Sequence, residues 1–230
     1  MNGKKGMQHV EFIISFVIFV GFLVLAFYFF SPVRGDRIVE STLFYTSDEI
    51  AENVSVNINL FSITVKDVEE DLIAIPFPEQ SGLNARVEDV NGNIIDSGFD
   101  NTNVHVDITG VDFLIVGFSE DFEPGSLNGG MVLTEGYTIS SSEIREVYSE
   151  KRLRALQSFY EGEGGYEESK EEFNLPARGN FGFVLEIGED KISAERNIPE
   201  GLEVFSQNDR VEVLRENGEV DFGEFRVLIW

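Results

Sequence analysis

The chain of 230 residues contains no cysteine, only two histidines and few basic residues. Without cysteine it can form no disulfide, no thiol nucleophile and no cysteine metal site, so a domain outside the cell would depend on its hydrophobic core. His9 and His105 are too few for a histidine-based metal cluster. Lysine and arginine number 17 against 42 aspartates and glutamates, which gives a formal net charge of −25. This charge repels nucleic acid, so we expect no nucleic-acid partner.

Motifs that carry catalysis or bind cofactors are also missing. The sequence has no glycine-rich phosphate loop and no nucleophile elbow. Residues 89–93 and 100–103 resemble pieces of calcium-binding loops, but they lack the twelve-residue spacing of an EF-hand, and turn chemistry explains them equally well. His105 alternates with Val104 and Val106, which predicts a place on the polar face of a strand. We therefore predict a protein that is not an enzyme and has no cofactor or metal.

One long apolar segment lies near the N-terminus. Residues 12–30 read FIISFVIFVGFLVLAFYFF and contain no charge. As a helix they would extend over about 28 Å, close to the hydrocarbon core of a bilayer. A secretory signal is shorter and is followed by a small-residue cleavage site, which is absent here. The segment therefore predicts a transmembrane helix that stays on the mature protein.

The residues in front of this segment form a pattern of their own. Lys4, Lys5 and Gly6 make a short basic leader that ends in glycine, and Glu11 would be the fifth residue of a chain beginning at Met7. Together with the apolar run, this pattern resembles the class III signal peptide of archaeal type IV pilin-like proteins. The resemblance covers about residues 4–30. It implies that a prepilin-type peptidase cuts between Gly6 and Met7.

The resemblance also implies how such subunits assemble. The new α-amino group of Met7 in one subunit would pair with the Glu11 carboxylate of a neighbour, since an unpaired carboxylate beside lipid costs a few kcal/mol. Alternatively, Glu11 lies in the headgroup layer of a monomeric anchor. The leader favours a single-pass orientation with the N-terminus inside the cell and the C-terminus outside.

Residue periodicity divides the rest of the chain. An amphipathic extension is expected over 31–55, after the leader (1–6) and the hydrophobic transmembrane or filament-core helix (7–30). Period-two alternation predicts a β-rich extracellular head over 56–230, with a hairpin at Asn91-Gly92. Ser140–Glu143 offers a capping box for a helix at about 141–161, and Glu161–Glu172 has the composition of a mobile loop. The predicted fold class is α+β: an N-terminal hydrophobic transmembrane or spine helix, then a sandwich-like head with one inserted helix.

From these features we predict a structural subunit, a major or minor pilin, of an archaeal type IV pilus-like surface filament that acts in cell adhesion. Its expected partners are homologous pilin subunits, a prepilin-type peptidase and the membrane. The sequon Asn53-Val54-Ser55 makes Asn53 a candidate N-glycosylation site on the cell surface. The alternative is a non-polymerising, membrane-anchored β-sandwich ectodomain that binds the cell envelope or assists an archaellum. A third hypothesis is an anchored hydrolase that uses carboxylates or calcium.

Overall fold

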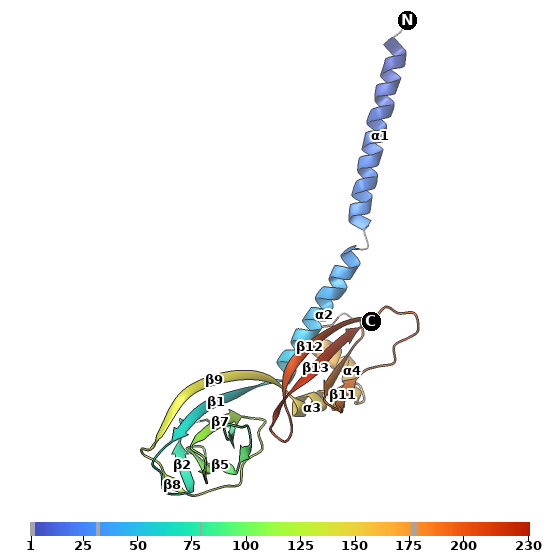
Figure 1. Ribbon diagram of the computed structural model, residues 1–230. Helices are drawn as coiled ribbons and strands as arrows, with labels where there is room; N and C mark the ends of the chain where they lie inside the picture. The colour runs from blue at the N-terminus through green and yellow to red at the C-terminus, as the bar shows by residue number, and fades with distance from the viewer. Residues whose placement is uncertain (1–2, 31–32, 79, 176–178) are drawn as a thin grey trace. The chain divides into compact units, whose positions relative to one another are not determined.

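The computed structural model describes the backbone of residues 3–30, 33–78, 80–175 and 179–230, and the side chains of 12–28, 39–78, 80–175 and 179–230. The chain divides into two compact units, Met1–Thr42 and Leu43–Trp230. Helix α1 (Gly3–Phe30) and the first part of α2 (Val33–Val54) belong to the first unit. The second unit, called the head below, holds the end of α2, all strands and two further helices (Figure 1).

The two N-terminal helices differ in the way their apolar residues are distributed. In α1 residues 12–28 are apolar apart from Ser15 and Gly21, and no proline interrupts the helix. In the last turns of α2, Leu43, Ile50 and Val54 are buried at helical spacing, while Glu49 and Glu52 are not. Only one stripe of these last turns of α2 therefore packs against the rest of the head.

The predicted transmembrane helix needs correction. Among the residues that the structure describes, no helix is both long and apolar enough to cross a membrane. In α1 the described side chains are those of 12–28, which at about 1.5 Å per residue extend over about 26 Å, whereas a hydrocarbon core is about 30 Å thick. The fold is therefore β-rich with four helices among the described residues, without the membrane-spanning element of the predicted fold class.

The head is built on a nine-stranded sheet in the order β11-β10-β13-β12-β9-β1-β7-β3-β4. Its strands are β1 (Ser55–Val65), β3 (Asn84–Glu88), β4 (Ile94–Ile95), β7 (Phe113–Ser119), β9 (Tyr137–Ser149), β10 (Phe181–Ile187), β11 (Asp190–Ala194), β12 (Phe205–Leu214) and β13 (Val220–Ile229). The long strands β1 and β9 lie side by side and pair antiparallel from Tyr137 to Tyr148 of β9 (Figure 1). Strand β12 joins β9 in parallel at only two residues, Tyr148 and Ser149.

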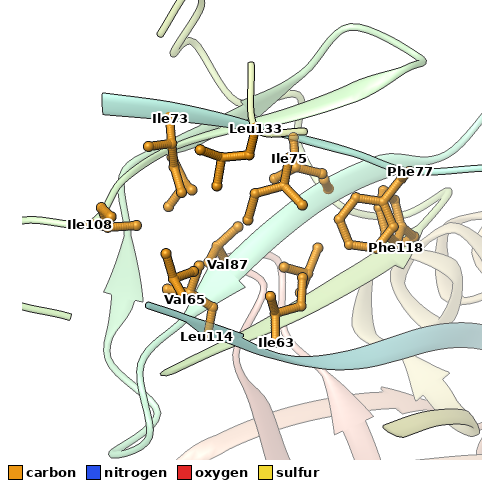
Figure 2. Packing of buried hydrophobic residues seen from close by; sticks show 14 residues of the cluster. Ile63, Val65, Ile73, Ile75, Phe77, Val87, Ile108, Leu114, Phe118 and Leu133 are labelled. Carbon is orange, nitrogen blue, oxygen red and sulfur yellow. The ribbon is translucent and has the colours of Figure 1, made fainter. Parts of the chain in front are cut away.

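A second sheet of four strands covers part of the first. It contains β5 (Ser97–Phe99), β6 (Asn103–Asp107), β2 (Leu72–Pro76) and β8 (Met131–Val132), in that order. The apolar residues of both sheets point toward one another and form a common core, as Figure 2 shows for Ile63 of β1, Ile75 of β2 and Val87 of β3. Phe118 is fully buried there and meets the rings of Phe61, Phe77 and Phe99 edge to face, with centroids 5.0–5.8 Å apart.

The C-terminal part of the head has a separate aromatic core. Helices α3 (Glu150–Glu161) and α4 (Gly165–Glu172) contribute Tyr160 and Tyr166, whose rings lie 5.3 and 5.7 Å from that of Phe181 in β10. The hydroxyl of Tyr160 donates to the Phe181 carbonyl at 2.7 Å. The two helices therefore pack on β10 and need no disulfide to hold them there.

The predicted single inserted helix at about 141–161 is wrong in two respects. Residues 141–149 belong to β9, because each of them from Ser141 to Tyr148 has a partner in β1, and helix α3 begins only at Glu150. The N-cap is Ser149, whose hydroxyl accepts from Arg152 N at 3.2 Å, and not the earlier serines. A second helix, α4, occupies the segment predicted as a mobile loop, since Tyr166 and Phe173 give it an apolar side to bury.

Candidate functional site

The surface of α1 is the first candidate for a functional site. Its large apolar side chains are exposed to between 37% and 75%. They are Phe12, Ile13, Ile14, Phe16, Val17, Ile18, Phe19, Val20, Phe22, Leu23, Val24, Leu25, Phe27 and Tyr28. Successive helical residues point about 100° apart, so consecutive exposed residues such as Phe16 to Val20 surround the helix on every side.

Such a helix needs a partner. A helix of a globular protein normally has one apolar stripe, and one that is apolar all round is buried. Fully burying a side chain of this size is worth about 1.5–3 kcal/mol, so covering α1 would release on the order of 20 kcal/mol. No charge lies between residues 12 and 28, so apolar partners can approach any side without burying an unpaired charge.

The sequence-predicted processing and pairing residues lie in the same helix. The backbone of Gly6, Met7 and Glu11 is helical within α1. Their side chains lie outside the described residues. The cleavage at Gly6-Met7 and the pairing of the Met7 amine with Glu11 therefore stay predictions.

The sequence-predicted glycosylation residue, Asn53, lies in the last turn of α2 and is exposed. Its side-chain amide donates to Glu172 Oε1 in α4 at 3.4 Å. The next residue, Val54, is fully buried, and Ser55 begins β1. The amide that would carry a glycan is thus accessible, while the backbone after it is held in the fold.

His105 lies on the face of β6 opposite the core-facing Val104 and Val106, as alternation predicted, but this face is closed to solvent. His105 is only 7% exposed, with Nδ1 2.6 Å from the Gly129 carbonyl oxygen and Nε2 3.1 Å from Asp100 Oδ2. The face of β6 opposite the core is covered because the segment after β7 crosses it, and Leu127 N donates to the Ser97 carbonyl there. Both ring nitrogens face oxygen acceptors, so His105 ties this segment to β6.

In the two acidic turns, 89–93 and 100–103, the aspartate carboxylates accept hydrogen bonds from residues of the same turn. Asp100 accepts hydrogen bonds from the Thr102 hydroxyl and from the backbone N–H groups of Asn103 and Thr102, which lowers the pKa of its carboxyl. Asp89 accepts from the side chain and the backbone of Asn93 with the same effect on its pKa. In the described ranges, no group of three or more histidine, aspartate or glutamate side chains could hold a metal ion. Turn formation accounts for both loops.

Among the described carboxylates, Glu150 is the most enclosed, at 3% exposure, and it has charged partners. Its Oε1 accepts from Arg154 Nη2 at 2.6 Å, and its Oε2 accepts from Arg215 Nε at 2.8 Å and from Glu216 N at 3.2 Å. Burial by itself raises the pKa of this carboxyl, but the hydrogen bonds from Arg154 and Glu216 and the charge of Arg215 outweigh it and hold the pKa below its usual value. The group is fully paired, so it links α3 to the turn between β12 and β13.

We expect Glu150→Gln to lower the free energy of unfolding by about 2 kcal/mol at pH 7, since hydrogen bonds to a charged group are worth about 1.5–3 kcal/mol. The folded pKa is depressed, so this stability is present above the usual glutamate value of 4.5 and is lost as the pH falls through the folded pKa. Guanidinium unfolding at pH 7 and pH 3 should show the difference between wild type and variant shrinking at the lower pH. Glu163→Gln, at an exposed position, is the control. A difference that stays constant with pH would contradict the role of the carboxylate.

Sequence analysis missed one further feature, the exposed strand β9. The serines at 140–142 and the spacing of Ile144 and Val147 favoured a helix, although Thr138, Ile139, Ile144 and Val147 are β-branched and suit a strand.

No protein-family model, curated protein or solved structure matches the chain. Function therefore has to be inferred from the chain's own residues.

Proposed function

We propose that the chain is a structural subunit, a major or minor pilin, of an archaeal type IV pilus-like surface filament. The observation that carries the proposal is α1, which exposes large apolar side chains on all sides over residues 12–28. In a filament, each α1 would be covered by the α1 helices of neighbouring copies. The leader pattern Lys4-Lys5-Gly6 and Glu11 supports the same function through its resemblance to class III signal peptides.

The charge distribution suits this arrangement. Nearly all of the acidic residues follow residue 43, and none lies in 12–28. Bringing uncharged helices together costs no charge desolvation, whereas the acidic heads repel one another and favour the outside, where salt screens them. The subunit would be held at the cell membrane before assembly. After cleavage the Met7 amine would pair with Glu11 of a neighbour and keep that carboxylate from being buried alone.

Leader processing tests this proposal first. The full chain is expressed together with an active prepilin-type peptidase, and the intact mass and the N-terminal peptide are measured. We expect a chain that begins at Met7, and we expect Gly6→Val to block cleavage while Gly3→Val, the matched change earlier in the leader, does not. A chain that keeps residues 1–6 beside a peptidase that cuts a control substrate would contradict the proposal and leave the anchored, non-polymerising ectodomain.

Filament formation is scored in the same cells by electron microscopy of the sheared fraction. Glu11→Ala should reduce the amount of filament, because the Met7 amine loses its partner and subunits dock less tightly. Glu40→Ala, which removes a carboxylate from α2, should leave the amount unchanged. Equal filament yields from wild type and Glu11→Ala would remove the proposed pairing from the mechanism.

A further inference from the structure

The outer edge of β9 is a long strand edge without a neighbour in the sheet. One side of β9 pairs with β1 from Tyr137 to Tyr148, whereas β12 reaches the other side only at Tyr148 and Ser149. In the described part of the chain, no other strand pairs with the edge from Thr138 to Val147. The N–H and C=O groups that point away from β1 along this edge are open to another strand.

The side chains along this edge are open as well. Every residue from Thr138 to Ile144 is exposed, on both faces of the strand, and Ile144 reaches 72%. Residues 137–149 contain neither proline nor lysine, the residues that commonly block edge pairing. The one irregularity of the ladder with β1 lies between Ser141 and Ile139, so the stretch from Ser142 to Val147 stays regular.

Two charges near the middle of this stretch are incompletely paired within the chain. Arg145 Nη2 is 3.6 Å from Glu143 Oε1, and its Nε is 3.8 Å from Glu212 Oε2. Both distances exceed the about 2.7–2.9 Å of a charge-assisted hydrogen bond. Glu143 and Arg145 are two residues apart and share one face of the strand, while Ile144 points to the other face.

This sequence is complementary to itself in one register. If two β9 edges pair antiparallel with Ile144 opposite Ile144, then Glu143 of each copy is opposite Arg145 of the other, twice across the two-fold axis. Centring the pair on Glu143 or Arg145 places like charges opposite, and centring it on Ser142 removes both ion pairs. Opposite charges across a ladder contribute roughly 0.2–1 kcal/mol each, and like charges destabilise it.

We infer that the outer edge of β9 is an interface between two copies of this chain, formed by antiparallel β9–β9 pairing centred on Ile144. A two-fold contact closes after two copies, so it joins heads in pairs and does not extend a chain of subunits. The inference rests on the head alone and holds whether or not α1 assembles filaments.

The absence of cysteine makes this register directly testable. In full-length Ile144→Cys the two new thiols would face each other, since opposite residues of an antiparallel pair have Cα atoms about 4.5–5.5 Å apart, within disulfide range. The matched control is Ile139→Cys, on the same strand, where the two thiols would lie on the order of 30 Å apart. After mild oxidation in detergent, non-reducing gels should show several-fold more disulfide-linked dimer for Ile144→Cys than for Ile139→Cys.

A charge swap tests the same register independently. In the Ile144→Cys background, Glu143→Arg should reduce the dimer yield several-fold, because arginines then face each other across the pair. Adding Arg145→Glu should restore the yield, because the two ion pairs return with exchanged partners. Equal dimer yields at 144 and 139, no dimer at 144, or no rescue by the double exchange would each overturn the inference.

Discussion

Replacing Phe19 with glutamate is expected to abolish filament formation while the head stays folded. Phe19 lies in the middle of the apolar part of α1 and is 56% exposed in the single chain. In a bundle of α1 helices the new carboxylate would be buried without a partner, which costs several kcal/mol for each subunit. Because this cost recurs in every subunit, we expect the amount of sedimentable filament to fall more than tenfold. Electron microscopy and sedimentation of the sheared fraction measure it.

The matched control for this change is Phe222→Glu. Phe222 is an aromatic residue of β13 with a similar exposure of 59%, but it lies in the head, beside the Arg210 guanidinium at 4.5 Å. A glutamate there remains at the surface and has a cation nearby, so filament yield should be unchanged. Filaments of normal yield from Phe19→Glu would contradict the burial of α1 among its copies.

Phe118→Ala is expected to lower the free energy of unfolding of the head by about 3–5 kcal/mol, the range for buried Phe→Ala changes. Phe118 of β7 is fully buried between the two sheets (Figure 2), and three phenylalanine rings lose an edge-to-face partner when it is truncated. Domains of this kind have a stability of only about 5–15 kcal/mol. The substitution therefore removes a large part of the free energy of unfolding of the head.

Guanidinium unfolding of the full chain, followed by circular dichroism, measures the Phe118→Ala effect. Phe222→Ala, at an exposed aromatic position, should change stability by less than about 1 kcal/mol. The backbone of Trp230, the single tryptophan, exchanges two hydrogen bonds with the backbone of Asn180 in the C-terminal part of the head. Its fluorescence therefore follows the unfolding of that part alone. A Trp230 transition that coincides with circular dichroism indicates one cooperative unit. A loss of less than about 1 kcal/mol for Phe118→Ala would contradict its place in the core.

Much of the strand content of the head was predictable, and the reason is local. Residues that alternate with period two, as in Ile63 to Val65 or Val104 to Val106, must present one apolar face to a core wherever the strand is placed. The hairpin at Asn91-Gly92 also follows from local chemistry, since Gly92 has a φ of +82°, which glycine adopts without strain. These features depend on neighbours in the sequence.

The errors concern residues whose neighbours are distant in the sequence. Ser141 to Tyr148 carry a pattern that fits a helix, but pairing with β1, 79 to 93 residues earlier in the sequence, makes them a strand. The helix α4 replaces a predicted loop because the ring of Tyr166 stacks on the ring of Phe181 in β10. His105 is covered by Gly129 and its neighbours, which alternation along β6 could not indicate. In β9 and α4, packing partners outside the local window overrode propensity.

The sequence by itself determined that the chain has no thiol chemistry, a strongly acidic head, an uncharged apolar segment over 12–30 and a β-rich remainder. The tertiary structure decided which strands pair, where α3 begins, that Glu150 and His105 are enclosed by partners, and that β9 keeps an open edge. The physical reason is that composition and periodicity act between nearby residues. Strand pairing, burial and ion pairing depend on contacts that only the folded chain brings together.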